Sequence, residues 1–177
     1  MLLRAEGSAL LLVDFQRRLL PAIHDADAVV ANAVRLAEGA RLLGVPVCAT
    51  EQNPDGLGTT VPELADLPQL VLPKTAFGAV AEPGFATLLP PGTTQVVVAG
   101  CEAHVCVLQT VLGLLGDERR VVLVSDAVGS RAPANKAAAV ERARAHGAEI
   151  VTTEMVLFEW MAASTHPRFR DVQKLIK

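Results

Sequence analysis

Short apolar runs alternate with longer segments of helical character along the whole chain. The runs are continuous and do not alternate with polar residues, which is typical of strands whose two faces are both covered. They predict six strands, at residues 9–13, 45–50, 70–73, 95–99, 121–125 and 149–153. Strands and helices in strict alternation favour a mostly parallel sheet with helices on both faces.

The segments between the runs supply the helices. Val29, Ala33 and Leu36 share one helical stripe after the first strand, and Gly44 then ends that helix. Further helices are predicted at residues 105–115, 134–146 and 155–161, with a last one from residue 167. Residues 51–69 contain three Pro and two Gly, so we expect a long loop there that lines a site. No repeat or linker divides residues 1–177, and we expect a single domain.

Composition narrows the function classes. The 177 residues are 51% hydrophobic and carry a net charge of −3. A nucleic-acid-binding domain normally has a basic excess, and none is present. Aromatic residues make up 3% of the chain and Tyr is absent, which argues against a base-stacking surface. We therefore expect no nucleic-acid partner.

The mean hydropathy of +0.36 raises the question of a membrane. The apolar runs end after a few residues, far short of the roughly 20 needed to span a bilayer. Three cysteines, Cys48, Cys101 and Cys106, are an odd number and do not suggest a disulfide framework. The sequence predicts a cytoplasmic protein with reduced thiols and no membrane partner.

Polar residues that directly follow strands are the first candidates for chemistry, because ligands of parallel sheets bind beyond the carboxyl ends of the strands. Asp14 follows the first strand and Lys74 the third. Cys106 lies at the predicted start of a helix, where the helix dipole favours an anion, so we expect its thiol to ionise easily. An acid, an amine and a thiol at such places suggest a nucleophilic site.

Each of these residues also has a structural alternative. Cys106 can be a small apolar residue that packs the helix on the sheet, and Asp14 can hydrogen bond the following turn. Lys74 can be a solvated loop charge. It is, however, the only Lys before position 136 in a chain that otherwise uses Arg, which suggests that a compact ammonium is needed there.

Three sequence blocks resemble those of the isochorismatase-like cysteine hydrolases. They are LVDFQ at 12–16, PKTAF at 73–77 and GCEAHVCVLQT at 100–110. TEQNPDGLG at 50–58 is similar to the branch that contains the YcaC-like hydrolases and the isochorismatase domain-containing proteins. The resemblance covers nearly the whole chain and implies one isochorismatase-like domain over residues 1–177.

The resemblance implies a three-layer α/β/α, Rossmann-like fold with strand order 3-2-1-4-5-6. It places the catalytic triad on Asp14, Lys74 and Cys106. Cys106 would attack an amide-like carbonyl while Asp14 takes its proton, Lys74 would stabilise the charged species, and water would hydrolyse the thioester. The family also implies a cis peptide bond between Cys101 and Glu102. That bond would aim the Glu102 N–H, beside that of Cys106, into an oxyanion hole.

Other residues have weaker roles. Gln52 and Phe77 lie next to the supposed site and are candidates for lining its pocket. His104 is a candidate substrate contact, but a local hydrogen bond is the favoured role. Nicotinamidases of the family hold a metal with an Asp-x-His pair after strand 2, whereas this chain has Glu51, Gln52 and Asn53 there. We therefore expect no metal and no other cofactor.

The sequence thus predicts a metal-independent cysteine hydrolase that acts on a small amide or related carbonyl compound. Two alternatives stay open. One is a catalytically idle member that binds a metabolite or a partner through the same pocket. The other is a thiol redox protein that uses Cys101 and Cys106. The resemblance also suggests a homo-oligomer.

Overall fold

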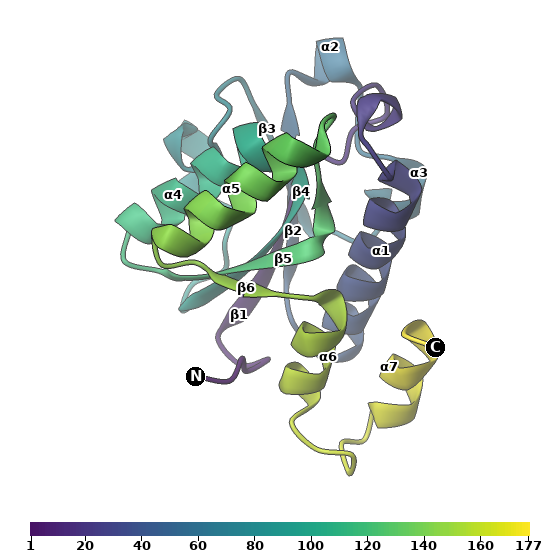
Figure 1. Cartoon of the computed structure of the whole chain (residues 1–177). Helices are drawn as coiled ribbons and strands as arrows, with labels where there is room; N and C mark the ends of the chain where they lie inside the picture. The colour runs from purple at the N-terminus through teal and green to yellow at the C-terminus, as the bar shows by residue number, and fades with distance from the viewer.

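The computed structural model describes residues 1–177 and is built around one six-stranded sheet. Its strands are β1 (Ser8–Val13), β2 (Val47–Gln52), β3 (Leu70–Lys74), β4 (Gln95–Cys101), β5 (Arg120–Gly129) and β6 (Glu149–Val151). All neighbouring strands pair in parallel, in the order β3-β2-β1-β4-β5-β6 (Figure 1). The predicted fold and strand order are confirmed.

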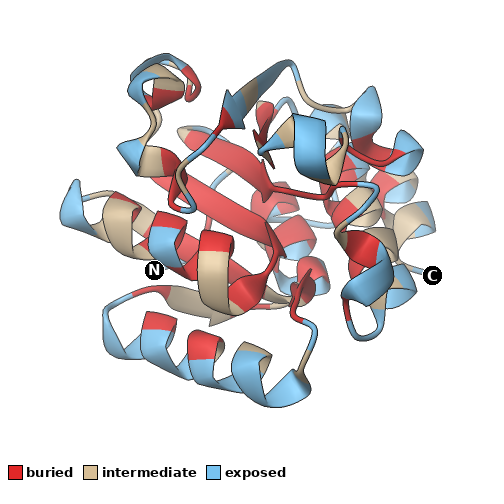
Figure 2. Cartoon of the chain, turned by 90° about the horizontal axis from the view of Figure 1, so that it is seen from above, coloured by how far each residue is buried: buried red, intermediate tan, exposed pale blue.

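Helices cover both faces of the sheet because successive side chains of a strand point to opposite faces. Leu10 of β1 belongs to the same apolar cluster as Leu36 and Trp160, on the face covered by α1 (Ala26–Leu42), α6 (Thr153–Met161) and α7 (Phe169–Leu175). Leu11 belongs to a second cluster with Val111, on the face of α4 (Leu108–Gly116) and α5 (Pro133–Ala145). Figure 2, seen from above, shows the buried strands at the centre and the exposed outer faces of the helices.

The segment between β2 and β3 is more regular than the sequence predicts. It contains two one-turn helices, α2 (Pro54–Leu57) and α3 (Pro62–Ala65), each with Pro in its first turn. Proline fits that position because its missing N–H would have no partner there. Three short 3-10 turns were also not predicted: η1 (Leu20–Ala22), η2 (Ala79–Ala81) and η3 (Pro83–Thr87).

The chain leaves β4 through a π-helical turn, η4 (Ala103–Val107), before α4 begins at Leu108. The sequence predicts one continuous helix from residue 105 instead. Single π-turns are frequent at functional sites.

Strands β1 and β4 approach each other closely at the point where the strand order reverses. Val13 is paired with Gly100, and a Cβ on Gly100 would lie 2.3 Å from the Val13 carbonyl oxygen. Only glycine fits this contact. The close approach brings the residues that follow β1 and β4 to one place, where open α/β sheets bind ligands. No helix in the fold has the length and apolar character needed to cross a membrane.

Candidate active site

Asp14 is the first residue after β1 and is completely buried. Its φ of 54° is in the left-handed region, which Asp tolerates better than most residues. Thr50 Oγ1 donates a hydrogen bond to Asp14 Oδ1 at 2.6 Å, and Lys74 Nζ donates to Oδ2 at 2.8 Å. Both carboxylate oxygens are therefore held, and the charge is compensated by a single ammonium.

Lys74 ends β3, and its side chain is fully buried. Besides Asp14, its Nζ donates to two carbonyl oxygens of the following turn, Ala76 at 3.1 Å and Phe77 at 2.8 Å. These three acceptors match the three N–H groups of an ammonium. The alternative of a solvated loop charge is thereby excluded, and the cation is fixed beside Asp14.

Cys106 lies in η4, and 6% of the residue is exposed. Burial, and after it the negative charge of Asp14, raise the pKa of its thiol to about 12, although Lys74 acts to lower it. The prediction of an easily ionised thiol is therefore wrong for the free protein. Desolvation disfavours the thiolate, and Asp14 compensates the ammonium that would otherwise stabilise it.

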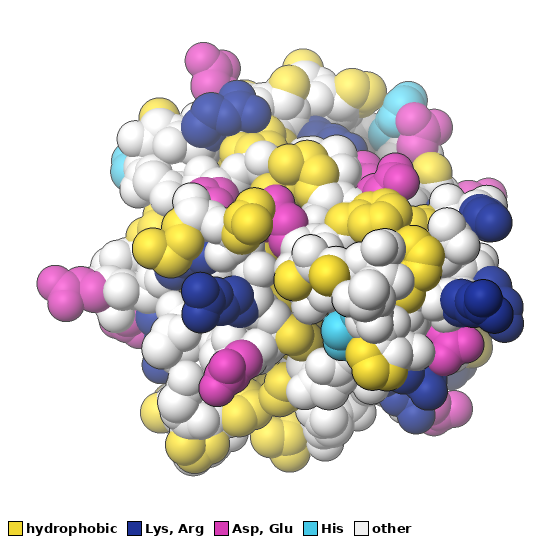
Figure 3. All heavy atoms as spheres, turned by 90° about the horizontal axis from the view of Figure 1, so that it is seen from below, with side chains coloured by type: hydrophobic (Ala, Val, Ile, Leu, Met, Phe, Trp, Pro, Cys, Tyr) yellow, Lys and Arg dark blue, Asp and Glu magenta, His cyan; other side chains and the backbone are white.

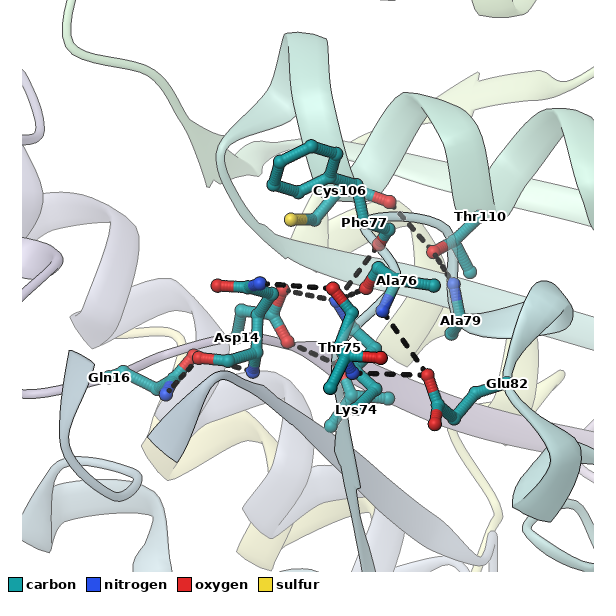
Figure 4. Close-up of polar contacts among 12 residues, drawn as sticks. Asp14, Gln16, Lys74, Thr75, Ala76, Phe77, Ala79, Glu82, Cys106 and Thr110 are labelled. Atoms are coloured by element: carbon teal, nitrogen blue, oxygen red, sulfur yellow. Dashed lines mark hydrogen bonds and ion pairs between the residues drawn. The ribbon is translucent and has the colours of Figure 1, made fainter. Parts of the chain in front are cut away.

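The three predicted triad residues lie around one site at the ends of β1, β3 and β4 (Figure 4). Asp14 and Lys74 form a buried ion pair, and both act on the pKa of the Cys106 thiol. A neutral thiol beside a carboxylate can lose its proton to that carboxylate when an electrophile arrives. The arrangement therefore suits a nucleophile that is activated during the reaction and not before it.

Glu102 precedes the π-turn. The peptide bond between Cys101 and Glu102 is cis, where the family resemblance placed such a bond. The Glu102 N–H donates no hydrogen bond to another group of the protein, although the residue is buried. Its carboxylate accepts hydrogen bonds from the Arg131 N–H at 2.9 Å and from Arg131 Nε at 3.1 Å. The free N–H leaves a donor for a ligand.

The three secondary candidates differ in their surroundings. Gln52 Nε2 donates to the Thr75 carbonyl oxygen at 3.2 Å, which places the amide against the turn that follows Lys74. Phe77 is 52% exposed, and Figure 4 shows its ring on the same side of the site as the Cys106 thiol. Both nitrogens of His104 have partners, Ser130 Oγ at 3.0 Å and Asn135 Nδ2 at 3.3 Å. These contacts favour the local role of His104.

Two polar residues of the site were not singled out from the sequence. Thr50 holds the second oxygen of Asp14, and it lies opposite Val13 in the β1–β2 register. Gln16 is buried; it accepts from the Gln52 N–H at 2.9 Å and donates to the Gly58 carbonyl oxygen at 2.6 Å. Both belong to blocks quoted above, Gln16 to LVDFQ and Thr50 to TEQNPDGLG, but neither residue was given a role there.

The other two cysteines do not share the site. Cys101 belongs to the apolar cluster on the α1 face of the sheet, whereas Cys106 belongs to the cluster on the α4 face. Cys48 is buried, and its Sγ donates to the Leu88 carbonyl oxygen. Because the sheet separates Cys101 from Cys106, the geometry gives no support to a redox pair of these two thiols.

The carboxylate at the end of β2, that of Glu51, is bonded within the protein. Glu51 Oε1 accepts from the Thr60 N–H at 2.6 Å and from Thr60 Oγ1 at 2.8 Å. No group of three or more His, Cys, Asp or Glu side chains in the chain is arranged to hold a metal ion. A surface cavity of about 810 Å³ lies against α1 and contains none of the triad residues.

Several known proteins are similar to this chain in sequence and in fold. A family model described as "Isochorismatase domain" matches residues 8–155. The chain is 42% identical over 167 residues to isochorismatase domain-containing protein 1 of Danio rerio, with 93% of this chain covered. The match spans 59% of that relative, less than two thirds of its length.

Two solved structures are similar over almost the whole chain. One is described as MAR1 ribonuclease from Caenorhabditis elegans; it has a TM-score of 0.93 and 36% identity, with 99% of this chain and 92% of that chain covered. The other is YcaC from Pseudomonas aeruginosa with hexane-2,5-diol and covalent acrylamide. It has a TM-score of 0.90 and 26% identity, with 98% of this chain and 91% of that chain covered.

Proposed function

The chain belongs to the isochorismatase domain family, and from this premise we propose that it is a metal-independent cysteine hydrolase of small amides or related carbonyl compounds. Cys106 is the nucleophile, Asp14 the general base and Lys74 the cation of the triad. The observation that carries the proposal is the buried Asp14–Lys74 ion pair beside a buried thiol. A purely structural role does not require an ion pair at that place.

The first half of the reaction forms a thioester. Asp14 takes the proton of the Cys106 thiol as the sulfur bonds to the substrate carbonyl carbon. The oxyanion that develops accepts hydrogen bonds from the Glu102 and Cys106 N–H groups. When the intermediate collapses, the carbon–nitrogen bond breaks, and Asp14 returns the proton to the leaving amine.

The second half regenerates the enzyme. Asp14 takes a proton from a water molecule whose oxygen attacks the thioester carbon. The carbon–sulfur bond breaks, the carboxylic acid leaves, and Asp14 returns the proton to the sulfur. Lys74 stays charged throughout and stabilises the negative charge that appears on sulfur and oxygen.

One comparison supports the nucleophile. The YcaC structure holds a covalent acrylamide, and acrylamide is an electrophile that thiolates attack. We therefore expect acrylamide and iodoacetamide to be usable probes of Cys106.

The decisive experiment is an assay of small amides with the wild type, Cys106→Ala and Cys48→Ala. We expect the wild type to hydrolyse at least one of these amides, and Cys48→Ala to keep nearly full activity. Cys106→Ala should lose activity at least about a hundredfold, which is the usual effect of removing a catalytic group. Full activity in Cys106→Ala would refute the mechanism. A wild type that binds these amides without turning any over would favour the idle binding protein instead.

The same assay should include single-stranded RNA, because one similar structure is described as a ribonuclease. We expect no cleavage, since the net charge is −3 and aromatic residues are scarce. On the face seen in Figure 3, basic side chains are interspersed with acidic ones. Cleavage of RNA that depends on Cys106 would overturn the choice of substrate class.

Light scattering will test the expected homo-oligomer.

A further inference from the structure

The turn that follows Lys74 is clamped from two sides. Glu82 Oε2 accepts hydrogen bonds from the Thr75 N–H at 3.1 Å and from the Ala76 N–H at 3.2 Å. At the far end of the turn, Thr110 Oγ1 accepts from the Ala79 N–H at 3.0 Å. Two polar side chains, Thr110 from α4 and Glu82 from just beyond the turn, therefore fix both ends of residues 75–79, here called the lysine turn.

Thr110 also contacts the nucleophile's own backbone. Its Oγ1 donates to the Cys106 carbonyl oxygen at 2.7 Å, and the residue is completely buried. The Thr110 hydroxyl thus donates a hydrogen bond to the π-turn that contains Cys106 and accepts one from the lysine turn (Figure 4). A side chain that could make only one of these bonds would not join the two segments.

The lysine turn also determines the position of the Lys74 ammonium. Ala76 and Phe77 direct their carbonyl oxygens at Lys74 Nζ, so the position of the turn decides where the ammonium lies. Packing makes the contact with α4 tight, because a Cβ on Gly78 would lie 3.2 Å from Gln109 Cβ. A shift of the turn away from α4 would carry the ammonium away from Cys106.

We propose that Thr110 and Glu82 are positioning residues, which hold the lysine turn so that the Lys74 ammonium stays at a fixed distance from Cys106. The inference rests on the proposed function, since it concerns the same site. It adds residues that touch neither the thiol nor the substrate and act through Lys74.

The test measures iodoacetamide labelling of Cys106 by peptide mapping, between pH 7 and 10, in wild type, Thr110→Val and Thr110→Ser. Valine keeps the shape and loses both hydrogen bonds, whereas serine keeps both. We expect labelling at pH 9 to fall about three- to tenfold in Thr110→Val, because a displaced cation stabilises the thiolate less, and to stay near wild type in Thr110→Ser. Thr87→Val is a matched control, because Thr87 makes its hydrogen bond within η3 and is exposed.

A Lys74→Met background separates positioning from packing. If Thr110 acts through Lys74, Thr110→Val changes labelling by less than about twofold in that background. An equal loss in both backgrounds would overturn the inference, as would wild-type labelling in Thr110→Val. If Thr110→Val does not fold, the Cys106 labelling rates of Glu82→Ala and Glu82→Gln are compared instead, because Glu82 is only partly buried and its variants are easier to accommodate. Slower labelling is expected in Glu82→Ala alone.

Labelling needs no substrate, so the two proposals fail separately. A protein that labels as expected but hydrolyses no amide refutes the proposed function and leaves the clamp in place. A protein that hydrolyses amides through Cys106 but labels equally fast in all these variants refutes the clamp alone.

Discussion

At the scale of single residues, the site is a balance between one buried anion and one buried cation. Asp14 has hydrogen bonds on both oxygens, and Lys74 has an acceptor for each N–H. A buried charge without a partner costs several kcal/mol, so the two residues depend on each other. The thiol beside them is neutral at rest because burial and Asp14 together outweigh Lys74.

Asp14→Asn should therefore separate thiol reactivity from catalysis. Removing the carboxylate leaves Lys74 uncompensated and lowers the pKa of Cys106, so iodoacetamide labelling at pH 8 should become faster, about tenfold for each unit of the shift. Amide hydrolysis should fall by about 10² or more, because Asp14 is the proposed base. Asp27→Asn, an exposed position on α1, is the control. Slower labelling in Asp14→Asn would contradict this account of the site.

The wild-type thiol has a predictable pH dependence. With a pKa of about 12, Cys106 stays protonated from pH 7 to 10. Its labelling rate should then rise about tenfold per pH unit over this range without a plateau. A plateau near pH 8 would mean that the thiol is far more acidic than its burial allows.

At the scale of elements, the site exists because β1 and β4 end side by side. Gly100 allows this approach, with Val13 Cβ at 2.7 Å from the position that a Cβ on Gly100 would occupy. The strand ends then bring Asp14 within reach of the turn that carries Cys106.

Gly100→Ala should disrupt the site through the sheet. The added methyl group collides with backbone and not with a flexible side-chain end, so β1 and β4 must separate. We expect unfolding to become easier by about 1–3 kcal/mol, as for other overpacked positions, together with loss of hydrolysis. Gly116→Ala is the control, since nothing lies within 4 Å of its added Cβ. Equal urea midpoints for the two variants would refute the argument.

The prediction about metals concerns the end of β2 and the segment that follows it. Glu51 is bonded to Thr60, and the segment contains no His. Activity should survive exhaustive EDTA treatment, with wild-type protein before and after treatment compared in the amide assay. Loss of activity that zinc, iron or manganese restores would show that this segment has a different role.

At the scale of the whole molecule, the three buried thiols make stability depend on pH. Burial raises the pKa of Cys48 to about 11, and it raises that of Cys101 and of Cys106 to about 12, all from an ordinary value of 9.0. Below pH 9 the thiols are neutral in both states. Above it the unfolded chain loses protons that the folded chain retains, so the free energy of unfolding decreases as pH rises toward the folded-state values.

The decrease should amount to about 1.4 kcal/mol per thiol for each pH unit above the ordinary value. The chain has no Tyr, so phenol groups do not contribute to the effect. Urea unfolding at pH 8 and 10 measures it, and Cys48→Ala should remove about a third of the difference, since one of three thiols is then absent. A difference that Cys48→Ala leaves unchanged would mean that other groups cause it.

The sequence by itself determined the layered α/β fold and the strand order, the latter through resemblance. Continuous apolar runs such as β1 and β4 report burial on both faces, and this signal is local. The sequence also indicated Asp14, Lys74 and Cys106 as the candidate site, because strand ends are recognisable and three short blocks mark a family.

Only the tertiary structure decided how acidic the thiol is and what holds the cation. A pKa depends on burial and on charges that are distant in sequence, and Asp14 lies 60 residues from Lys74. Thr110 and Glu82 act through hydrogen bonds to backbone N–H and carbonyl groups, which every residue type provides. Such contacts leave no pattern in the sequence, so they become visible only when the chain has folded.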